Sequence, residues 1–277
     1  MTAKASREKM FLNLALIGNP LSHTFSPFIQ TRFLKSSGLN GGFCCFETDG
    51  GHALAETIDT LKKYSFKGFN VTVPHKEEIR QYLISENEVA SGVGAVNTVL
   101  NDNGLKGFNT DVYGFEEMLK DGGCDMKGSE VLLLGCGGAS KAVLYSLKNS
   151  DVKLTVVNRD TGKAERILKA MNFDRASVQD YNFIKTDRNF DYVINGTSMG
   201  LKDGVFADMS SVGCGKAAVD LQYKKGLTPF LMQMSGCGCK LLDGFPMLVY
   251  QAAKAFEIWT GLSPVFTVKE IAGELGL

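Results

Sequence analysis

The sequence has no excess of either charge and no long apolar run. Lys and Arg number 30, as do Asp and Glu, so the formal net charge is zero. Binding to nucleic acid or to a membrane surface usually needs a basic patch, so we expect neither partner. The N-terminal apolar stretch at 11–17 is interrupted by Asn13 and is too short for a signal-peptide core or a membrane span. We therefore expect a cytoplasmic protein.

Patterns that indicate metal sites or disulfides are also scarce. The seven cysteines are an odd number, and several lie inside apolar runs. Cys237 and Cys239 are separated by one glycine, which is not a C-x-x-C motif, and no second pair stands at a zinc-ligand spacing. We interpret the cysteines as small buried hydrophobic side chains in a reducing compartment, and we expect no metal.

Apolar runs and helical patterns alternate along the chain, without repeats or a low-complexity linker, and this predicts a parallel α/β architecture. Ser26 and Pro27 predict a helix start, with Ser26 as N-cap. Pro74 ends a short strand, and a helix is expected from Lys76. The expected strands are 12–18, 43–46, 69–73, 95–100, 105–108, 130–134, 154–157, 192–194 and 217–221, and a long apolar helix is expected at 247–259. A domain boundary is expected near 111–114.

A glycine-rich turn follows the strand at 130–134 and opens a helix. It contains Gly135, Gly137, Gly138 and Ala139, and Ser140 stands where the third glycine of G-x-G-x-x-G would be. Such glycines let the backbone approach a pyrophosphate at a helix N-terminus. The match is imperfect, and any glycine-bearing strand-to-helix turn would look similar. The context nevertheless favours a dinucleotide site.

The end of the next strand bears on which dinucleotide binds. Asn158 lies 23 positions after Gly135, where an NAD site usually carries an acid. Here Arg159 follows at once, with Lys163 close behind, and cations suit a 2′-phosphate. We therefore favour NADP over NAD, although Asp160 argues mildly the other way and Arg159 could be an ordinary solvated residue.

Three polar clusters occur in the first half, at 22–26, at 70–76, and at 95–98 with a similar Asn-Thr pair at 109–111. Each can be interpreted simply as a helix cap or a turn. Lys76 is less easily explained in this way, because a lysine at a helix start would oppose the helix dipole. Reduction of a ketone by hydride requires a proton donor. With only three histidines in the chain, Lys76 oriented by Asp111 is a reasonable candidate.

Taken together, these segments resemble the shikimate dehydrogenase family, including its quinate-using relatives. The resemblance extends from Ile17 to Gly261. Its motifs occur in order, at 20–27, 70–76, 94–98, 109–111, 135–159, 195–200 and 243–251. The resemblance implies reduction of 3-dehydroshikimate to shikimate with NADPH in chorismate and aromatic amino-acid biosynthesis.

The resemblance also implies roles for individual residues. Lys76 and Asp111 match the catalytic pair of the family. The residues implied in substrate binding are Thr24, Ser26, Asn70, Thr72, Asn97, Tyr223 and Gln251. Cofactor contacts are expected from Gly135, Gly137, Gly138, Ala139, Asn158, Arg159, Lys163, Thr197 and Met247.

The implied fold has an N-terminal α/β substrate domain, residues 1–110, completed by the C-terminal helices at 245–277. A Rossmann-type NADP-binding domain, residues 111–244, lies between them in the sequence. Only small-molecule partners are expected, with a monomer or a homodimer as the assembly. Four residues depart from the family pattern, namely Thr24, Gln30, Asp160 and Pro246.

The departures at Thr24 and Asp160 leave alternatives open. A quinate or mixed quinate/shikimate dehydrogenase, possibly using NAD, fits the same scaffold. A folate-type dehydrogenase would need a different lysine arrangement. A dinucleotide-binding sensor without activity would have no need of both Lys76 and Asp111.

Overall fold

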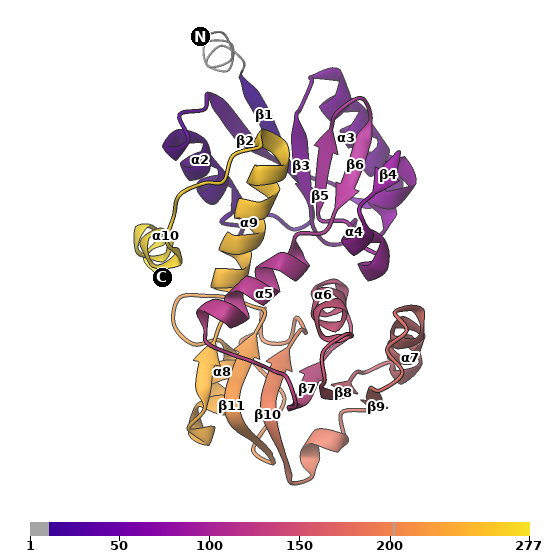
Figure 1. Cartoon of the computed structure of the whole chain (residues 1–277), viewed down its shortest axis with the longest axis vertical. Coiled ribbons are helices and arrows are strands. Elements are labelled where there is room, and N and C mark those ends of the chain that lie inside the picture. The colour runs from indigo at the N-terminus through magenta and orange to yellow at the C-terminus, as the bar shows by residue number, and fades with distance from the viewer. Residues whose placement is uncertain (1–10, 202) are drawn as a thin grey trace. The chain divides into compact units, whose positions relative to one another are not determined.

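The computed structural model describes residues 11–201 and 203–277, which form two compact units (Figure 1). The first unit comprises the chain up to Gly114 together with Leu248–Ile271, and the second comprises Phe115–Met247 with Ala272–Leu277. The divisions fall inside helices α5 (Asp111–Asp121), α9 (Phe245–Thr260) and α10 (Val268–Leu275). The roles and boundaries assigned to the two domains from the sequence remain predictions.

The first unit is built on a six-stranded sheet of order β2-β1-β3-β5-β6-β4. Strands β1, β2 and β3 are parallel, whereas β5 runs antiparallel to both β3 and β6. The strands are β1 (Leu12–Gly18), β2 (Gly41–Glu47), β3 (Gly68–Val71), β4 (Ser85–Glu86), β5 (Thr98–Asn101) and β6 (Leu105–Phe108). The helices are α2 (Ser26–Ser36), α3 (Gly50–Lys63) and α4 (Glu88–Val93).

The part of α9 beyond Met247 packs within the first unit. Trp259 lies against Gly68, where an added Cβ would stand 2.2 Å from the indole ring, and its Nε1 donates to the carbonyl of Val99 at 2.9 Å. The rings of Phe33 in α2 and Phe256 in α9 meet edge to face at 5.8 Å. Chain segments more than 150 residues apart in sequence therefore share one core.

The second unit contains an all-parallel sheet of order β9-β8-β7-β10-β11-β12. Its elements are β7 (Glu130–Leu134), α6 (Gly138–Leu147), β8 (Lys153–Val157), α7 (Thr161–Ala170), β9 (Ser177–Gln179), η2 (Phe183–Lys185), β10 (Arg188–Asn195), β11 (Val212–Asp220), α8 (Pro229–Met234), η3 (Ser235–Cys237) and β12 (Lys240–Leu242). In chain order this is the doubly wound arrangement 3-2-1-4-5-6. Apolar clusters cover both faces, one from α5, α6 and α7 and the other from α8 and η2.

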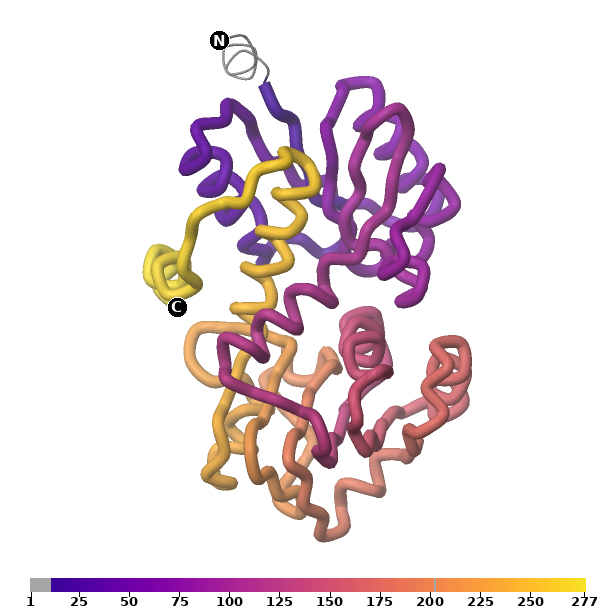
Figure 2. The backbone as a smooth tube through the Cα atoms, in the orientation of Figure 1, coloured from indigo at the N-terminus to yellow at the C-terminus, as the bar shows by residue number. Residues whose placement is uncertain are grey.

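Strand order in this unit locates a ligand crevice. The order reverses between β7 and β10, and ligands of doubly wound sheets bind beyond the carboxyl ends of the strands at that point. Figure 2 traces the chain from α5 into β7 and from β10 into β11. The turn after β7 and the segment after β10 are thus the two sides of the expected cofactor site. The predicted Rossmann-type α/β fold is confirmed.

Three local predictions were wrong. Only Cys136 and Cys214 are buried, whereas the other five cysteines are exposed or half-buried, so the interpretation of the cysteines as buried side chains holds for those two alone. The helix expected from Lys76 is a turn followed by the short 3₁₀ helix η1 (Glu78–Tyr82), because the carbonyl of Lys76 accepts from the backbone N–H of Val96 at 2.8 Å instead of continuing a helix. Ser26 is not the N-cap of α2 either. Phe25 holds that position, and Thr24 Oγ1 instead accepts from the backbone N–H of Ser26 at 3.2 Å. No helix within the described residues is long and apolar enough to cross a membrane.

Candidate active site

Lys76 and Asp111 form a close ion pair in the first unit. The lysine lies in the turn after β3, and the aspartate is the first residue of α5. Lys76 Nζ stands 2.6 Å from Asp111 Oδ2, and the two side chains are 15% and 10% exposed. Because both charges are largely withdrawn from water, each depends on the other for compensation. The pair predicted from the sequence as catalytic is therefore assembled.

Asn97 holds the second oxygen of the Asp111 carboxylate. Its Nδ2 donates to Asp111 Oδ1 at 2.8 Å and to Thr110 Oγ1 at 3.0 Å. Its Oδ1 accepts from the backbone N–H of Thr110 at 2.8 Å and from Thr98 Oγ1 at 3.0 Å. Asn97 is 3% exposed, so its amide is fixed by the protein on every side. The carboxylate thereby keeps one oxygen free to face Lys76.

Further amides around this pair extend the network. Asn70 Nδ2 donates to Thr98 Oγ1 at 3.0 Å, and Gln251 Oε1 from α9 lies 3.4 Å from Thr110 Oγ1. Asn109, which was not among the predicted site residues, accepts through Oδ1 from the backbone N–H of Asp111 at 3.0 Å and thereby fixes the start of α5. The Asn-Thr-Asp motif was the signal for this role.

A pair of hydroxyls stands at the start of α2. Thr24 Oγ1 and Ser26 Oγ are 3.1 Å apart, and Ser26 is buried whereas Thr24 is half-buried. Thr72 follows β3, and its methyl group lies where a Cβ on Gly18 would stand, 2.3 Å away. Glycine at position 18 therefore gives Thr72 its place beside the end of β1.

Of the three histidines, only His75 is enclosed by protein groups. His75 is fully buried, and its ring nitrogens contact the carbonyl of Thr48 at 2.7 Å and Glu78 Oε2 at 3.1 Å. His23 and His52 are exposed. His75 thus anchors the turn that carries Lys76, rather than presenting a ring nitrogen to a ligand.

The glycine turn of the second unit has the features of a phosphate-binding turn. Gly135 has φ +87°, which disfavours any side chain, and an added Cβ would stand 2.7 Å from Thr197 Cγ2. At Gly137 an added Cβ would meet nothing within 4 Å, so the packing of the protein does not itself require a glycine there. A glycine that opens such space at a helix N-terminus suits the close approach of a pyrophosphate.

Ser140 replaces the third glycine of the fingerprint without loss of close packing. The Ser140 Oγ donates to the carbonyl of Gly196 at 3.3 Å. A Cβ added to Gly196 would stand 2.2 Å from the Ser140 Oγ. Gly196, directly after β10, is therefore the small residue that permits close contact between α6 and the sheet.

Cations gather around this turn. Burial raises the pKa of the Cys136 thiol to about 11, and the positive charges of Lys141 and Lys163 oppose that rise. Lys163 was predicted from the sequence, whereas Lys141 was missed. The signal for Lys141 was its place in the first turn of α6, where a positive charge opposes the helix dipole.

Arg159 follows β8 and is exposed. Across residues 11–201 and 203–277, its guanidinium has no ion pair or hydrogen bond. Asp160 is engaged elsewhere, because it is the N-cap of α7 and its Oδ1 accepts from the backbone N–H of Lys163 at 2.8 Å. The acid that argued against NADP is thus a helix cap, and the arginine beside it is available for an anion. Asn158 donates through Nδ2 to the carbonyl of Asp160 at 2.7 Å.

The remaining predicted residues lie at the carboxyl ends of the strands or beyond them. Thr197 follows β10, Tyr223 follows β11, and Met247 lies in the first turns of α9. All three belong to the second unit, whereas the Lys76–Asp111 pair belongs to the first. The roles of Tyr223 as a substrate contact and of Met247 as a cofactor contact stay predictions.

Comparison with known proteins identifies the family. Three family models match the chain, described as the shikimate dehydrogenase substrate binding domain at residues 16–99, shikimate / quinate 5-dehydrogenase at 117–202, and the shikimate 5′-dehydrogenase C-terminal domain at 244–265. A shikimate dehydrogenase (NADP(+)) of Caldanaerobacter subterraneus subsp. tengcongensis is 38% identical over 270 residues, covering 94% of this chain and 96% of the relative. The chain belongs to the shikimate dehydrogenase family.

Solved structures agree with this assignment. Shikimate dehydrogenase from Aquifex aeolicus is 34% identical with a TM-score of 0.85, and the match covers 95% of this chain and 97% of that one. The Thermus thermophilus enzyme, solved in complex with NADP(H) and shikimate, is 34% identical with a TM-score of 0.83, covering 96% of this chain and all of the other. The resemblance inferred from the motifs is therefore confirmed for the family and for the two-domain α/β fold.

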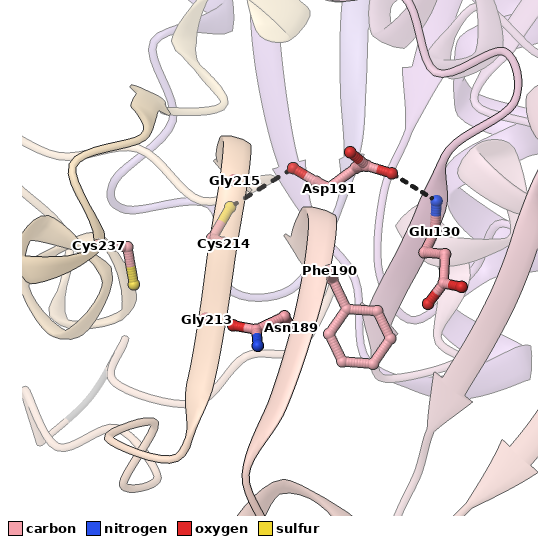
Figure 3. A pocket seen from close by; sticks show the side chains of 8 residues that line it. All are labelled: Glu130, Asn189, Phe190, Asp191, Gly213, Cys214, Gly215 and Cys237. Carbon is pink, nitrogen blue, oxygen red and sulfur yellow. Dashed lines mark hydrogen bonds between the residues drawn. The ribbon is translucent and has the colours of Figure 1, made fainter.

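A cavity of about 510 Å³ in the second unit of this shikimate dehydrogenase family member lies away from the glycine turn (Figure 3). It is lined by residues at the amino ends of β7, β10 and β11 and by Cys237 of η3, including Glu130, Asn189 and Gly213. Ligands of doubly wound sheets bind at the opposite, carboxyl edge. We therefore assign this cavity no part in the candidate active site.

Proposed function

We propose that this protein is an NADP-dependent shikimate dehydrogenase, an oxidoreductase that reversibly reduces 3-dehydroshikimate to shikimate in chorismate and aromatic amino-acid biosynthesis. Membership of the family supports the reaction class. The observation that carries the proposal to this chain is the 2.6 Å contact between Lys76 and Asp111, with Asn97 on the other carboxylate oxygen. A sensor that only bound the dinucleotide would have no use for such a proton-donating pair.

The proposed chemistry divides between cofactor and protein. NADPH, when bound, supplies the hydride that adds to the carbonyl carbon of the substrate. Lys76 donates a proton to the carbonyl oxygen, so that ketone, hydride and proton give the secondary alcohol. Asp111 holds the ammonium by its charge and directs it, while Asn97 fixes the carboxylate. In the reverse direction, neutral Lys76 accepts the hydroxyl proton.

The other polar residues of the first unit bind the substrate in this proposal. Thr24 and Ser26 take its carboxylate through their hydroxyls at the start of α2, where the helix N-terminus also favours an anion. Contacts to the ring hydroxyls and neighbouring atoms come from Asn70, Thr72, Asn97, Tyr223 and Gln251. Water-excluded amides suit this task, because they discriminate hydroxyl positions by hydrogen bonding.

The residues of the second unit fit NADP. Gly135, Gly137, Gly138 and Ala139 form the turn that takes the pyrophosphate at the start of α6. Arg159 and Lys163, after β8, take the 2′-phosphate, supported by the absence of an acidic partner for Arg159 within the described residues. Asn158, Thr197 and Met247 complete the proposed cofactor contacts.

Shikimate is proposed over quinate because of Thr24. Its hydroxyl can bind the carboxylate as a serine would, but its methyl adds bulk beside the ring carbon that bears the carboxylate. That carbon is flat and unsaturated in shikimate, whereas in quinate it carries a further hydroxyl. The methyl therefore disfavours quinate.

One set of assays tests these proposals. Oxidation of shikimate and quinate is followed by the appearance of reduced cofactor, with NADP and with NAD, in the wild type and in Thr24→Ser. The expected result is highest kcat/KM for shikimate with NADP and a gain of quinate oxidation in Thr24→Ser. No turnover of either acid would refute the proposed function, whereas a wild type that prefers quinate would refute only the role of Thr24.

We also propose a cytoplasmic location and a monomer or homodimer that binds only small molecules. The balanced charge of the chain supports the absence of nucleic-acid and membrane partners. Light scattering on the eluted protein distinguishes the two assemblies.

A further inference from the structure

Asp220 is a buried carboxylate that the proposed reaction does not use. It ends β11 and is 1% exposed. Its Oδ1 accepts from Asn195 Nδ2 at 2.8 Å and from the backbone N–H of Gln222 at 3.0 Å, whereas Oδ2 accepts from Thr228 Oγ1 at 2.5 Å. Burial raises its pKa to about 6 in spite of these three donors. Burying a carboxylate costs free energy, so a role of Asp220 is to be sought in the groups that it contacts.

The partners of Asp220 Oδ1 lead to the segment after β10. Asn195 Oδ1 accepts from Thr197 at both the backbone N–H, 2.9 Å away, and the hydroxyl, 2.7 Å away. The side chain of Gln222 donates through Nε2 to the carbonyls of Thr197 at 2.7 Å and Met199 at 2.9 Å. Residues 195–199 are therefore tied on two sides to groups that bond to Asp220.

This segment in turn packs against the glycine turn. Thr197 Cγ2 approaches Gly135 so closely that a Cβ there would lie within 2.7 Å, and Ser140 bonds to the carbonyl of Gly196. The two strands concerned, β7 and β10, are those at which the sheet order reverses. The position of Thr197 thus defines one side of the crevice in which doubly wound sheets bind a dinucleotide.

We propose that Asp220 is a positioning residue for the cofactor, which through Asn195 and Gln222 holds Thr197 in the conformation that receives NADP. The inference rests on the proposed function, because it takes NADP as the ligand. The two carboxylate oxygens have separate tasks. Oδ1 serves the crevice, and Oδ2 serves Thr228, which caps α8 by accepting from the backbone N–H of Leu231 at 3.2 Å.

Asp220→Ala tests the first task. Without the carboxylate, residues 195–199 occupy the binding conformation for only part of the time, and the apparent Kd for NADPH rises by the inverse of that fraction, by about tenfold. Cofactor fluorescence measures the Kd. Saturating NADP selects the binding conformation, so kcat and the KM for shikimate should stay within about twofold of the wild type. Asp220→Asn should rescue affinity, since its amide oxygen still accepts from Asn195 and Gln222.

Thr228→Val is the matched control. It removes the donor to Oδ2 and the cap of α8, which should lower Tm, but it leaves Oδ1 and NADPH affinity unchanged. Should Asp220→Ala not fold, Asp220→Ser replaces it, because the serine oxygen lies one bond short of the carboxylate oxygens. The proposal is overturned if the folded variant binds NADPH as the wild type does, or if Thr228→Val loses as much affinity. A wild type that binds NADPH but does not oxidise shikimate would instead refute the proposed function.

Discussion

At the scale of single residues, the site depends on compensation between buried charges. Lys76 and Asp111 are 35 positions apart, and nothing in their spacing brings them together. The contact arises because β3 ends, and α5 begins shortly after β6 ends, at the same edge of the first sheet. Breaking a largely buried pair leaves one charge uncompensated, which is more costly than the pair itself is stabilising. Variants at either residue must therefore be read for stability as well as for rate.

Lys76→Ala should reduce kcat by about a hundredfold or more, the usual scale for loss of a positioned proton donor. Asp111 keeps its bond to Asn97, so the fold should survive with a lower Tm. Steady-state kinetics and thermal unfolding measure the two effects. Lys62→Ala, at an exposed position of α3, is the control and should behave as the wild type. Near-full turnover by Lys76→Ala would remove Lys76 from the proposed reaction.

Gln30 places an unsatisfied hydrogen-bond acceptor in the core of the first unit, which should lower its stability. It is fully buried, and its Nε2 donates to the carbonyl of Ala252 at 3.0 Å, but its Oε1 has no hydrogen-bond partner within the described residues. An unsatisfied buried acceptor costs about 1–3 kcal/mol. Gln30→Met, of similar length, should therefore leave the free energy of unfolding unchanged or raise it. A clear decrease would indicate that Oε1 is satisfied, for example by an ordered water.

At the scale of secondary structure, apolar patterns in the sequence predicted the long strands. They missed the elements whose conformation is set by residues far away in the sequence. The runs at 12–18 and 130–134 are apolar because their strands are covered, and both were predicted with the observed bounds. The two-residue strand β4 has no such pattern, since it pairs only with β6. The turn at Lys76 likewise follows from its bond to Val96, which local sequence does not encode.

The same limit applies to the candidate site. Motifs predicted Asn97 and Thr197 as site residues, but the carboxylate that fixes Thr197 through Asn195 was not found. Asp220 lies 25 positions from Asn195, and at the end of a strand an aspartate reads as an ordinary turn residue. Burial is what distinguishes it, and burial at a strand end is set by the packing of α8.

The segment after β8 sets the expected cofactor preference. Arg159→Ala should lower kcat/KM with NADP by about tenfold to a hundredfold, the value of a charge-assisted contact, and leave NAD kinetics nearly unchanged. Arg175→Ala is the control, because that exposed arginine only approaches Asp151 at 3.9 Å. Competition between the two cofactors measures the preference. Equal use of NADP and NAD by the wild type would assign the choice to another feature.

At the scale of the whole molecule, the two units can be followed by different probes. The single tryptophan, Trp259, lies in the first unit, whereas the second unit has none and contains Asp220. Tryptophan fluorescence therefore reports on unfolding of the first unit, and circular dichroism reports on helices of both. A stability effect that originates at Asp220 should be visible in the circular dichroism transition.

Stability of the second unit should fall as pH rises through about 6, because of Asp220. Its pKa is raised to about 6 by burial, so the folded state binds the proton more tightly than the unfolded chain, whose aspartates titrate near 3.9. The stabilisation is complete below the unfolded pKa and is lost as pH rises through the folded one. Asp220→Asn removes the titration, so its stability relative to the wild type should rise by about 1.4 kcal/mol between pH 5 and pH 8. Urea unfolding at both values measures this, and since the other titrating groups, Asp243 among them, are common to both proteins, they cancel to first order. A constant difference would mean that Asp220 is already ionised at pH 5 and that its three hydrogen bonds outweigh its burial.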